Sequence, residues 1–289
     1  MVTSLIRPSH SRFATRSLSR RPNLWKDLVG CWKPSLGVTG ITTLRDVSGF
    51  ERHGTMNGSM TIDDWVIGGN PKLPGYALET DEVDDHILIP DFDYGANGNF
   101  SICFWYSVDD VSGLAFQYIF SHGAVNTTNS VNIFFLENNI RIRTILLDSG
   151  DTAVNVDILD AFIDGLWHFY VVTVEAGIGQ KIYLDGIEIV ANANGGNGTF
   201  NPTTGIYLGG REDLNVDRFY GGLLNNYTIY NRALLPSEIL DMFQHPNAMF
   251  QFRDRVIGKA PAVVTVPDDT LAATMQMANS GGMIGAVNV

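Results

Sequence analysis

The densest run of groups that could do chemistry is the acidic stretch ETDEVD at 79–84. Two carboxylates on either side of a glycosidic bond are the machinery of most glycoside hydrolases. In an extended strand alternate side chains share a face, so Glu79 and Asp81 would lie together and Asp84 would point to the other side. One face therefore presents Glu79 and Asp81 but not Asp84, so the run does not gather its carboxylates in one cluster, which argues against a catalytic use.

Other chemical motifs are missing from the sequence. It contains no G-x-S-x-G elbow, H-E-x-x-H pair, phosphate-binding loop or dinucleotide-binding fingerprint. Its six histidines are scattered and have no metal-ligand spacing. Cys31 and Cys103 lie in apolar runs and are too few for a disulfide framework, so we expect two buried free thiols. We therefore assign no catalytic residue and no cofactor, and expect that the protein is not an enzyme.

Charge is spread unevenly along the 289 residues, whose net charge is −12. The first 26 residues carry six positive charges and no acidic residue, which leaves −18 on the remaining 263. An acidic body repels nucleic acid and anionic membranes, so we expect neither as a partner. The basic segment could instead bind an acidic protein surface.

The first residues resemble no secretory signal, because MVTSLIRPSHSRFATRSLSRRP lacks an apolar core. Rich in Arg and Ser and poor in acids, the segment also has the composition of a mitochondrial presequence, which stays open as an alternative to a flexible or partner-ordered arm. No apolar run approaches the ~18–20 residues that a membrane helix needs.

Strand-like runs dominate from residue 28 to about 230, separated by Gly, Asn or Asp. About a dozen short strands with hairpin connections predict an all-β, two-sheet antiparallel sandwich. FSICFWYS and WHFYVVTV are nearly continuous apolar runs, as in strands covered on both sides. The expected strands are 28–32, 76–79, 86–89, 100–107, 117–121, 131–136, 140–146, 153–158, 167–174, 181–184, 187–191, 205–208 and 223–230.

Two hairpin turns are explicit. Asp185-Gly186 suits a type I′ turn, whose two central residues need positive φ, and Asn138-Asn139 looks similar. Arg141 and Arg143 alternate with apolar residues and should share one strand face.

One short helix is expected at 234–243, where Pro and Glu precede four apolar residues. The predicted organisation is a basic arm at 1–27, a sandwich domain at 28–245 and an extended tail at 246–289. The tail has no charge after Asp269, and we expect it to lie on a partner or a neighbouring subunit.

Several segments, taken in order, resemble the LamG-like modules of the concanavalin A-like jelly-roll superfamily. They are LVGCWKPS, LRDVSGFERHGTMNG, GYALETDEVDDHILIP, FSICFWYSV, GLWHFYVVTVEAGIGQKIYLDGIEI and FYGGLLNNYTIYNRALLPSEI. The resemblance covers roughly 28–245 and implies a jelly roll with Trp32, Trp105 and Trp167 in its core. It also implies that Asp81 to Asp85 form a turn.

The resemblance suggests structural roles for two further residues. Arg232 of the NRAL stretch should tie loop carbonyls together, and His168, which follows a tryptophan, should be a hydrogen-bonded structural histidine.

Candidate binding residues also follow from the resemblance. Jelly rolls of this superfamily often hold a calcium ion, and Asp46 and Asn226 occupy the matching positions, although an amide lacks the aspartate's charge. The alternative is that Asp46 caps its own turn. The 79–84 run is similar to the carboxylate cluster of laminarinase-type glycosidases. Four aromatic residues in or near loops are candidates for stacking on sugar rings: Trp65, Tyr94, Tyr118 and Tyr220.

The leading functional hypothesis is a non-catalytic virion structural protein, of the capsid decoration or head-fibre type, because such modules resemble proteins of bacterial viruses. It would bind a capsid or another virion shell through its termini, contact surface glycans weakly, and work as a homo-oligomer or part of a larger assembly. The alternatives are a carbohydrate-binding or adhesion lectin at a cell surface or outside the cell, and a polysaccharide-cleaving glycosidase.

Overall fold

The computed structural model describes residues 19–34, 41–67, 72–73, 75–111, 113–124, 129–136, 141–147, 153–159, 162–192 and 200–251. The chain divides into two compact units, Met1–Phe252 and Arg253–Val289, and every described residue lies in the first. Among these residues, no helix is long and apolar enough to cross a bilayer.

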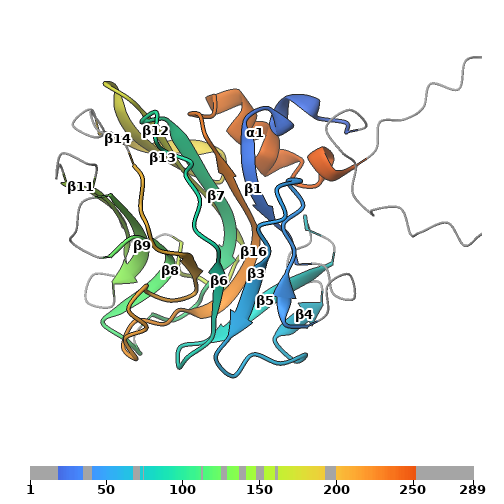
Figure 1. The fold of residues 1–289 in the computed structure, drawn as a ribbon, viewed down its shortest axis with the longest axis vertical. Coiled ribbons are helices and arrows are strands. Elements are labelled where there is room, and N and C mark those ends of the chain that lie inside the picture. Colours follow the sequence, from blue (N-terminus) through green and yellow to red (C-terminus); the bar gives the residue numbers. More distant parts are fainter. Residues whose placement is uncertain are drawn as a thin grey trace, which may run out of the picture. The chain divides into compact units, whose positions relative to one another are not determined.

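Two antiparallel sheets of eight strands each build the body, which confirms the predicted jelly-roll sandwich (Figure 1). The first sheet runs β14-β13-β12-β7-β16-β5-β4, with β1 paired to β16. Its strands are β1 Leu28–Trp32, β4 Trp65–Ile67, β5 Tyr76–Asp81, β7 Phe100–Ser107, β12 His168–Glu175, β13 Gly179–Leu184, β14 Ile187–Asn192 and β16 Gly221–Tyr230.

The second sheet runs β11-β10-β9-β8-β15-β6-β3-β2. Its strands are β2 Thr43–Leu44, β3 Gly54–Asn57, β6 His86–Ile89, β8 Phe116–His122, β9 Ser130–Leu136, β10 Arg141–Leu147, β11 Ala153–Leu159 and β15 Ile206–Leu208. The described residues also form three short helices, η1 Pro22–Trp25, α1 Pro236–Gln244 and η3 Ala248–Phe250.

An inner core fills the space between the sheets, and β7 shows how the sequence builds it. Phe104 belongs to this inner core, and its ring stacks on Tyr170 and Tyr227 with centroids 5.0 Å from each. Such aromatic pairs add roughly 0.5–1.5 kcal/mol each beyond the area that they bury. Because side chains alternate along a strand, the neighbours of Phe104 point to the opposite face of the first sheet.

An outer core covers that opposite face. Trp105 of β7 stacks on Phe169 at 5.0 Å and on Phe243 of α1 at 5.8 Å. Cys31 and Cys103 lie in the same outer core as free, buried thiols, as predicted. Burial raises the pKa of Cys103 to about 12. The central strands therefore read as continuous apolar runs because both of their faces are covered.

The helix α1 is short, and its N-terminus is stabilised by its own residues. Pro236 stands in its first turn, and the Glu238 carboxylate accepts a hydrogen bond from the Leu235 backbone N–H at 3.0 Å. Ile239 and Met242 bury its inner face in the outer core. The expected helix at 234–243 is thus found at 236–244.

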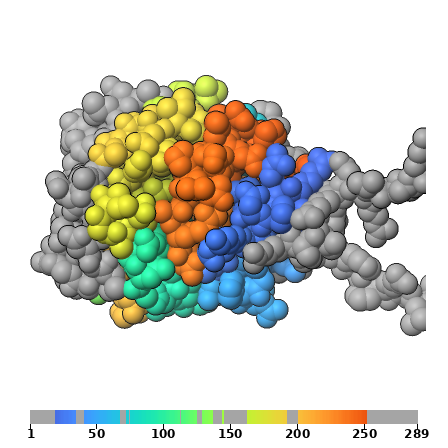
Figure 2. Space-filling view, turned by 90° about the horizontal axis from the view of Figure 1, so that it is seen from above, coloured from blue at the N-terminus to red at the C-terminus, as the bar shows by residue number. Residues whose placement is uncertain are grey.

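The two ends of the described body meet beside α1. The Ser19 hydroxyl and the Trp25 indole both donate to the Met249 carbonyl, at 2.6 and 2.9 Å, and the Arg20 N–H donates to the Gln251 carbonyl at 2.9 Å. Figure 2 shows the N-terminal segment in blue against the C-terminal segment in orange. Residues 19–27 and 246–251, expected in an arm and a tail, therefore pack on the body. Residues 1–18 and 252–289 lie outside the described residues.

Several local expectations can be compared with the structure. Asp185 and Gly186 have φ of 51° and 81°, which confirms the predicted hairpin turn. Every expected strand is present within two residues at each end, whereas β2, β3 and β4 were not predicted. These three strands have only two to four residues, too few to show an alternating pattern. The Asn138-Asn139 turn and the side chains of Arg141 and Arg143 lie outside the described residues.

Candidate functional site

A cleft of about 530 Å³ opens on the outer face of the first sheet, beside the start of α1. Four parts of the chain line it: the turn at Asp27, residues 97–99, strands β12 and β13, and the 231–236 connection. These segments adjoin on the face shown in Figure 2. We call this hollow the polar cleft.

The floor of the polar cleft follows from strand alternation. Phe169 and Val171 of β12 point outward into the outer core. The next outward positions are Thr173 and Glu175, and both line the cleft. The outer face of β12 therefore changes from apolar and covered at Phe169 and Val171 to polar at Thr173 and exposed at Glu175.

One wall is the NRAL connection, which Arg232 holds rigid. Its guanidinium donates to both Glu238 oxygens, at 2.6 and 2.9 Å, and to the Lys26 carbonyl at 3.2 Å. Burial opposes both charges, but the hydrogen bonds between them outweigh it, so the pKa of Arg232 is raised and that of Glu238 is lowered. The Ser101 hydroxyl donates to the Arg232 carbonyl at 2.9 Å and accepts from the Leu234 N–H at 2.9 Å. This confirms the expected structural role of Arg232.

The opposite wall is made of amides. The Asn99 backbone N–H donates to Asn97 Oδ1 at 2.9 Å, and Asn99 Oδ1 accepts from the Ala176 N–H at 3.0 Å. The Asn97 amide reaches across to the Asn231 carbonyl at 3.4 Å. These bonds fix polar groups around the cleft before any ligand arrives, which lowers the entropy cost of binding.

Charge in the polar cleft is unbalanced. Lys181 is held by Glu188 at 3.1 Å, and the Tyr183 hydroxyl donates to the same carboxylate at 3.1 Å. Burial, with that neighbouring carboxylate, raises the pKa of Tyr183 to about 12. The exposed Glu175 carboxylate has no hydrogen-bond or ion-pair partner among the described residues. The cleft therefore offers a free acceptor of hydrogen bonds, while its cations are already paired.

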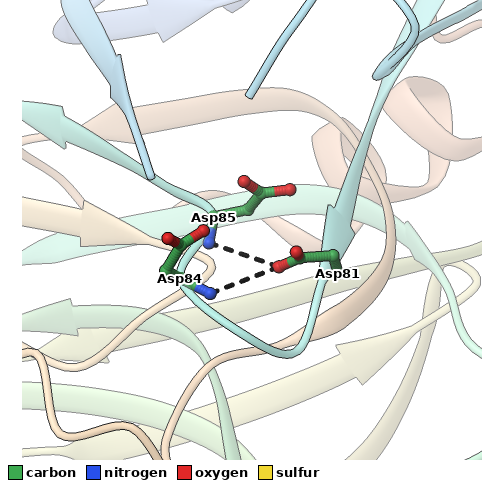
Figure 3. Close-up of side chains that lie close together, drawn as sticks. All are labelled: Asp81, Asp84 and Asp85. Carbon is green, nitrogen blue, oxygen red and sulfur yellow. Dashed lines mark hydrogen bonds between the residues drawn. The ribbon is translucent and has the colours of Figure 1, made fainter. Parts of the chain in front are cut away.

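A second acidic region lies at the turn between β5 and β6, and we call Asp81, Asp84 and Asp85 the acidic turn. Carboxylate oxygens of these three residues lie within 4.8 Å of one another, and oxygen is the ligand that Ca²⁺ prefers (Figure 3). Asp85 is buried, and burial together with the neighbouring carboxylates raises its pKa to about 6.

The carboxylates of the acidic turn already have internal partners. Asp81 Oδ1 accepts from the backbone N–H groups of Val83, Asp84 and Asp85 at 2.9, 3.3 and 3.4 Å. Asp84 Oδ1 accepts from the Ser59 N–H and hydroxyl, both at 2.9 Å. The expected turn is confirmed, and the side chain of Asp81 serves to hold it.

The structure does not join Asp46 and Asn226 in one ion site. Asp46 is buried; its Oδ1 accepts from the Cys31 and Ser48 N–H groups at 3.1 and 2.8 Å, and its Oδ2 from the Arg52 N–H at 3.1 Å. Asn226 Oδ1 accepts from Lys33 Nζ at 3.2 Å. These oxygens are engaged elsewhere, so the pair does not fit a shared calcium ion, whereas Asp46 caps its own turn.

Lys33 is a buried cation that sequence reasoning missed. Its Nζ lies 3.2 Å from both Asn226 Oδ1 and Asn247 Oδ1 and 5.2 Å from the centre of the Phe250 ring. Among the described residues it has no carboxylate partner. Burial lowers its pKa to about 8. A lysine directly after a buried strand was the only sequence signal for it.

The four aromatic residues predicted to stack on sugars are all buried, with 5% or less of each exposed. The Trp65 indole donates to the Ile41 carbonyl, the Tyr220 hydroxyl donates to the Ser107 carbonyl, and the Tyr94 hydroxyl lies 3.1 Å from His122 Nδ1. Tyr118 stacks on another ring, that of Phe134. None of the four presents a ring face to solvent, because three belong to the inner core and Tyr118 to a smaller buried cluster with Phe134.

His168 has the structural role expected for it. Its Nδ1 lies 2.8 Å from Asp185 Oδ2 and its Nε2 lies 3.0 Å from Asp164 Oδ1. Burial lowers the pKa of His168, but the two carboxylates more than offset this and raise it overall. Trp32 and Trp105 are buried, which confirms the prediction for these two, whereas Trp167 is only half-buried and packs against the outer core.

Comparisons with solved structures show the same fold. The botulinum neurotoxin serotype D ligand binding domain in complex with N-acetylneuraminic acid aligns with a TM-score of 0.59 and 13% identity, over 78% of this chain and 52% of that one. The binding domain of Paraclostridial Mosquitocidal Protein 1 gives 0.59 and 15%, over 76% and 52%. Trypanosoma rangeli sialidase gives 0.54 and 16%, over 78% and 34%.

This chain thus spans about half the length of the two toxin domains. No curated protein sequence matches it well enough to count as a relative. The family model of the concanavalin A-like lectin/glucanases superfamily named Laminin_G_3 matches residues 81–240, more than half of the chain, and confirms the LamG-like resemblance. The chain belongs to this Laminin_G_3 family of jelly rolls.

Proposed function

We propose that this jelly roll is a non-catalytic glycan-binding module that uses the polar cleft as its binding site. The observation that carries the proposal is a cleft of about 530 Å³ whose amide walls are fixed and whose Glu175 carboxylate is free to accept hydrogen bonds. Ligand sites of this kind combine a concave shape with a few fixed polar groups.

The solved neighbours support this class of ligand. One of them was determined with N-acetylneuraminic acid and another is a sialidase. Both share the fold of this chain at low sequence identity, so the position of the cleft rests on the geometry of this chain alone.

A role without catalysis is part of the proposal. Glycoside hydrolysis needs two carboxyl groups on either side of the scissile bond. In the 79–84 run, Asp81 is engaged by three backbone N–H groups of its own turn. In the polar cleft, Asp27 Oδ2 lies 3.8 Å from the Arg232 Nε. A reducing-sugar assay on the bound glycans should therefore show no turnover, and measurable turnover would reject this part of the proposal.

The binding test is a titration of the full chain with the best glycans from an array. Glu175→Gln should weaken binding about tenfold, because a hydrogen bond to a charged acceptor is worth roughly 1.5–3 kcal/mol. Glu79→Gln is the matched control, since Glu79 is exposed on the same sheet outside the cleft. Equal affinities for both variants and the unaltered chain would reject the cleft as the site.

We further propose that the module is carried on a virion surface, as a capsid decoration or head-fibre protein, with a cell-surface or extracellular lectin as the alternative. The basic character of the first 26 residues and the meeting of Ser19 and Met249 support this, because both ends of the body leave it at one place. A partner could then hold both termini without covering the whole sandwich.

Two measurements test the virion proposal. Mass spectrometry of purified virus particles from the producing host should detect the chain in stoichiometric amounts. Replacing Arg7, Arg12 and Arg16 by Ser should reduce that amount several-fold. Particles without the chain would favour the lectin alternative.

A further inference from the structure

We propose that the polar cleft selects uncharged glycans and excludes sialylated ones, an inference that rests on the proposed glycan-binding function. It concerns the chemical class of the ligand, and it follows from which charges of the cleft are free and which are paired.

The cations beside the cleft are committed to internal partners. Arg232 makes hydrogen bonds to both oxygens of Glu238, and Lys181 Nζ lies 3.1 Å from Glu188 Oε2. A carboxylated sugar would have to compete with these carboxylates for its counter-charge. Breaking the largely buried Arg232–Glu238 pair would leave Glu238 without its cation, which costs more than the new contact returns, whereas the half-exposed Lys181–Glu188 pair is the weaker of the two.

The anions of the cleft, in contrast, face the space that a ligand would fill. Glu175 is exposed and its carboxylate has no partner among the described residues. Asp27 is also exposed, and its carboxylate forms only a long ion pair, with Oδ2 3.8 Å from the Nε of Arg232, whose guanidinium is already bonded to Glu238. Like charges brought together across an interface are unfavourable by up to several kcal/mol, so an entering carboxylate would be repelled.

An uncharged sugar meets neither difficulty. Its hydroxyl groups can donate charge-assisted hydrogen bonds to Glu175, and they can accept from the exposed side-chain amide of Asn231. Its apolar C–H face can lie against Leu235, which lines the cleft and is 61% exposed. The net charge of −18 on residues 27–289 adds a repulsion of longer range that weakens with salt.

The test compares neutral oligosaccharides with their sialylated derivatives, in matched pairs such as lactose and 3′-sialyllactose, using the full chain. We expect the neutral member of each bound pair to bind at least tenfold more tightly. Glu175→Lys should reduce this preference at least tenfold, and Glu79→Lys, outside the cleft, should leave it unchanged. Thermal unfolding of each variant checks that it is folded.

The outcomes distinguish a failure of the selectivity from a failure of glycan binding itself. Equal or tighter binding of the sialylated members would overturn the selectivity while glycan binding stands. An unchanged preference in Glu175→Lys would place the selectivity outside the cleft and overturn the inference. Failure to bind any glycan would overturn the proposed function and this inference with it.

Discussion

The polar cleft and the acidic turn both gather carboxylates, yet they treat them in opposite ways. In the acidic turn the three aspartates lie within five residues of one another, and Asp81 and Asp84 accept hydrogen bonds from backbone N–H groups. In the cleft Glu175 stands alone in sequence and its carboxylate has no partner among the described residues. A dense acidic run therefore indicates a turn here, whereas the better binding candidate is an isolated residue left unpartnered.

The largest effect should come from breaking the wall of the polar cleft. Arg232→Ala removes a largely buried partner of Glu238, and we expect a loss of about 3–4 kcal/mol in the free energy of unfolding. Glycan affinity should fall at least tenfold, because the 231–236 connection loses its anchor. Denaturant unfolding and a titration measure the two quantities.

A double-mutant cycle provides the control for this change. Glu238→Ala should cost a similar amount, and the double variant should cost clearly less than the sum of the two, because the two residues act on each other while each keeps one further contact. Strictly additive costs would show that Arg232 acts through other contacts.

A comparable effect on the free energy of unfolding is expected at Lys33. Its amino group is buried, whereas the Glu175 carboxylate of the cleft is exposed. The pKa of Lys33 falls from 10.5 to about 8 on folding, so the unfolded chain binds more protons between these values and stability rises with pH across that window. The gain should reach about 3 kcal/mol by pH 10.5.

Lys33→Met should remove this pH dependence, as chemical denaturation between pH 7.5 and 10.5 would reveal. Lys181→Met is the matched control, because the Lys181 side chain is 43% exposed and lies outside the outer core. If the free energy of unfolding rises with pH equally in the unaltered chain and in Lys33→Met, the pH dependence does not come from Lys33.

The smallest effect should come from the acidic turn. Asp81→Ala leaves three turn N–H groups without their acceptor, but these groups lie near the surface where water can replace it. We expect a loss of about 1–2 kcal/mol in the free energy of unfolding and no change in glycan affinity. A loss of glycan binding in this variant would transfer the functional site from the cleft to the turn.

Much of the fold could be predicted because it depends on local pattern. The apolar run FSICFWYS indicates a strand covered on both faces, and Trp105 and Phe104 do lie in separate cores on its two sides. Asp185-Gly186 predicts its hairpin because few other residue pairs tolerate positive φ at both positions. The family resemblance added the order of the segments.

The candidate site could not be predicted in the same way. The side chains that line the cleft come from segments as far apart as Asp27 and Asn231. Whether an aromatic residue near a loop is exposed also depends on the neighbouring strand ends, and for Tyr94 and Tyr220 the sequence could not tell.

The sequence by itself determined the longer strands, the hairpin, the helix at 236–244 and the uneven charge, since each depends on residues close together in the chain. Tertiary structure alone decided which polar groups are satisfied and which stay free. Asp46 accepts a hydrogen bond from the Cys31 N–H of β1, whereas Glu175 lies beyond the part of β12 that the outer core covers. Partnership between distant groups is a property of packing, and that is why binding capacity emerges only in the folded chain.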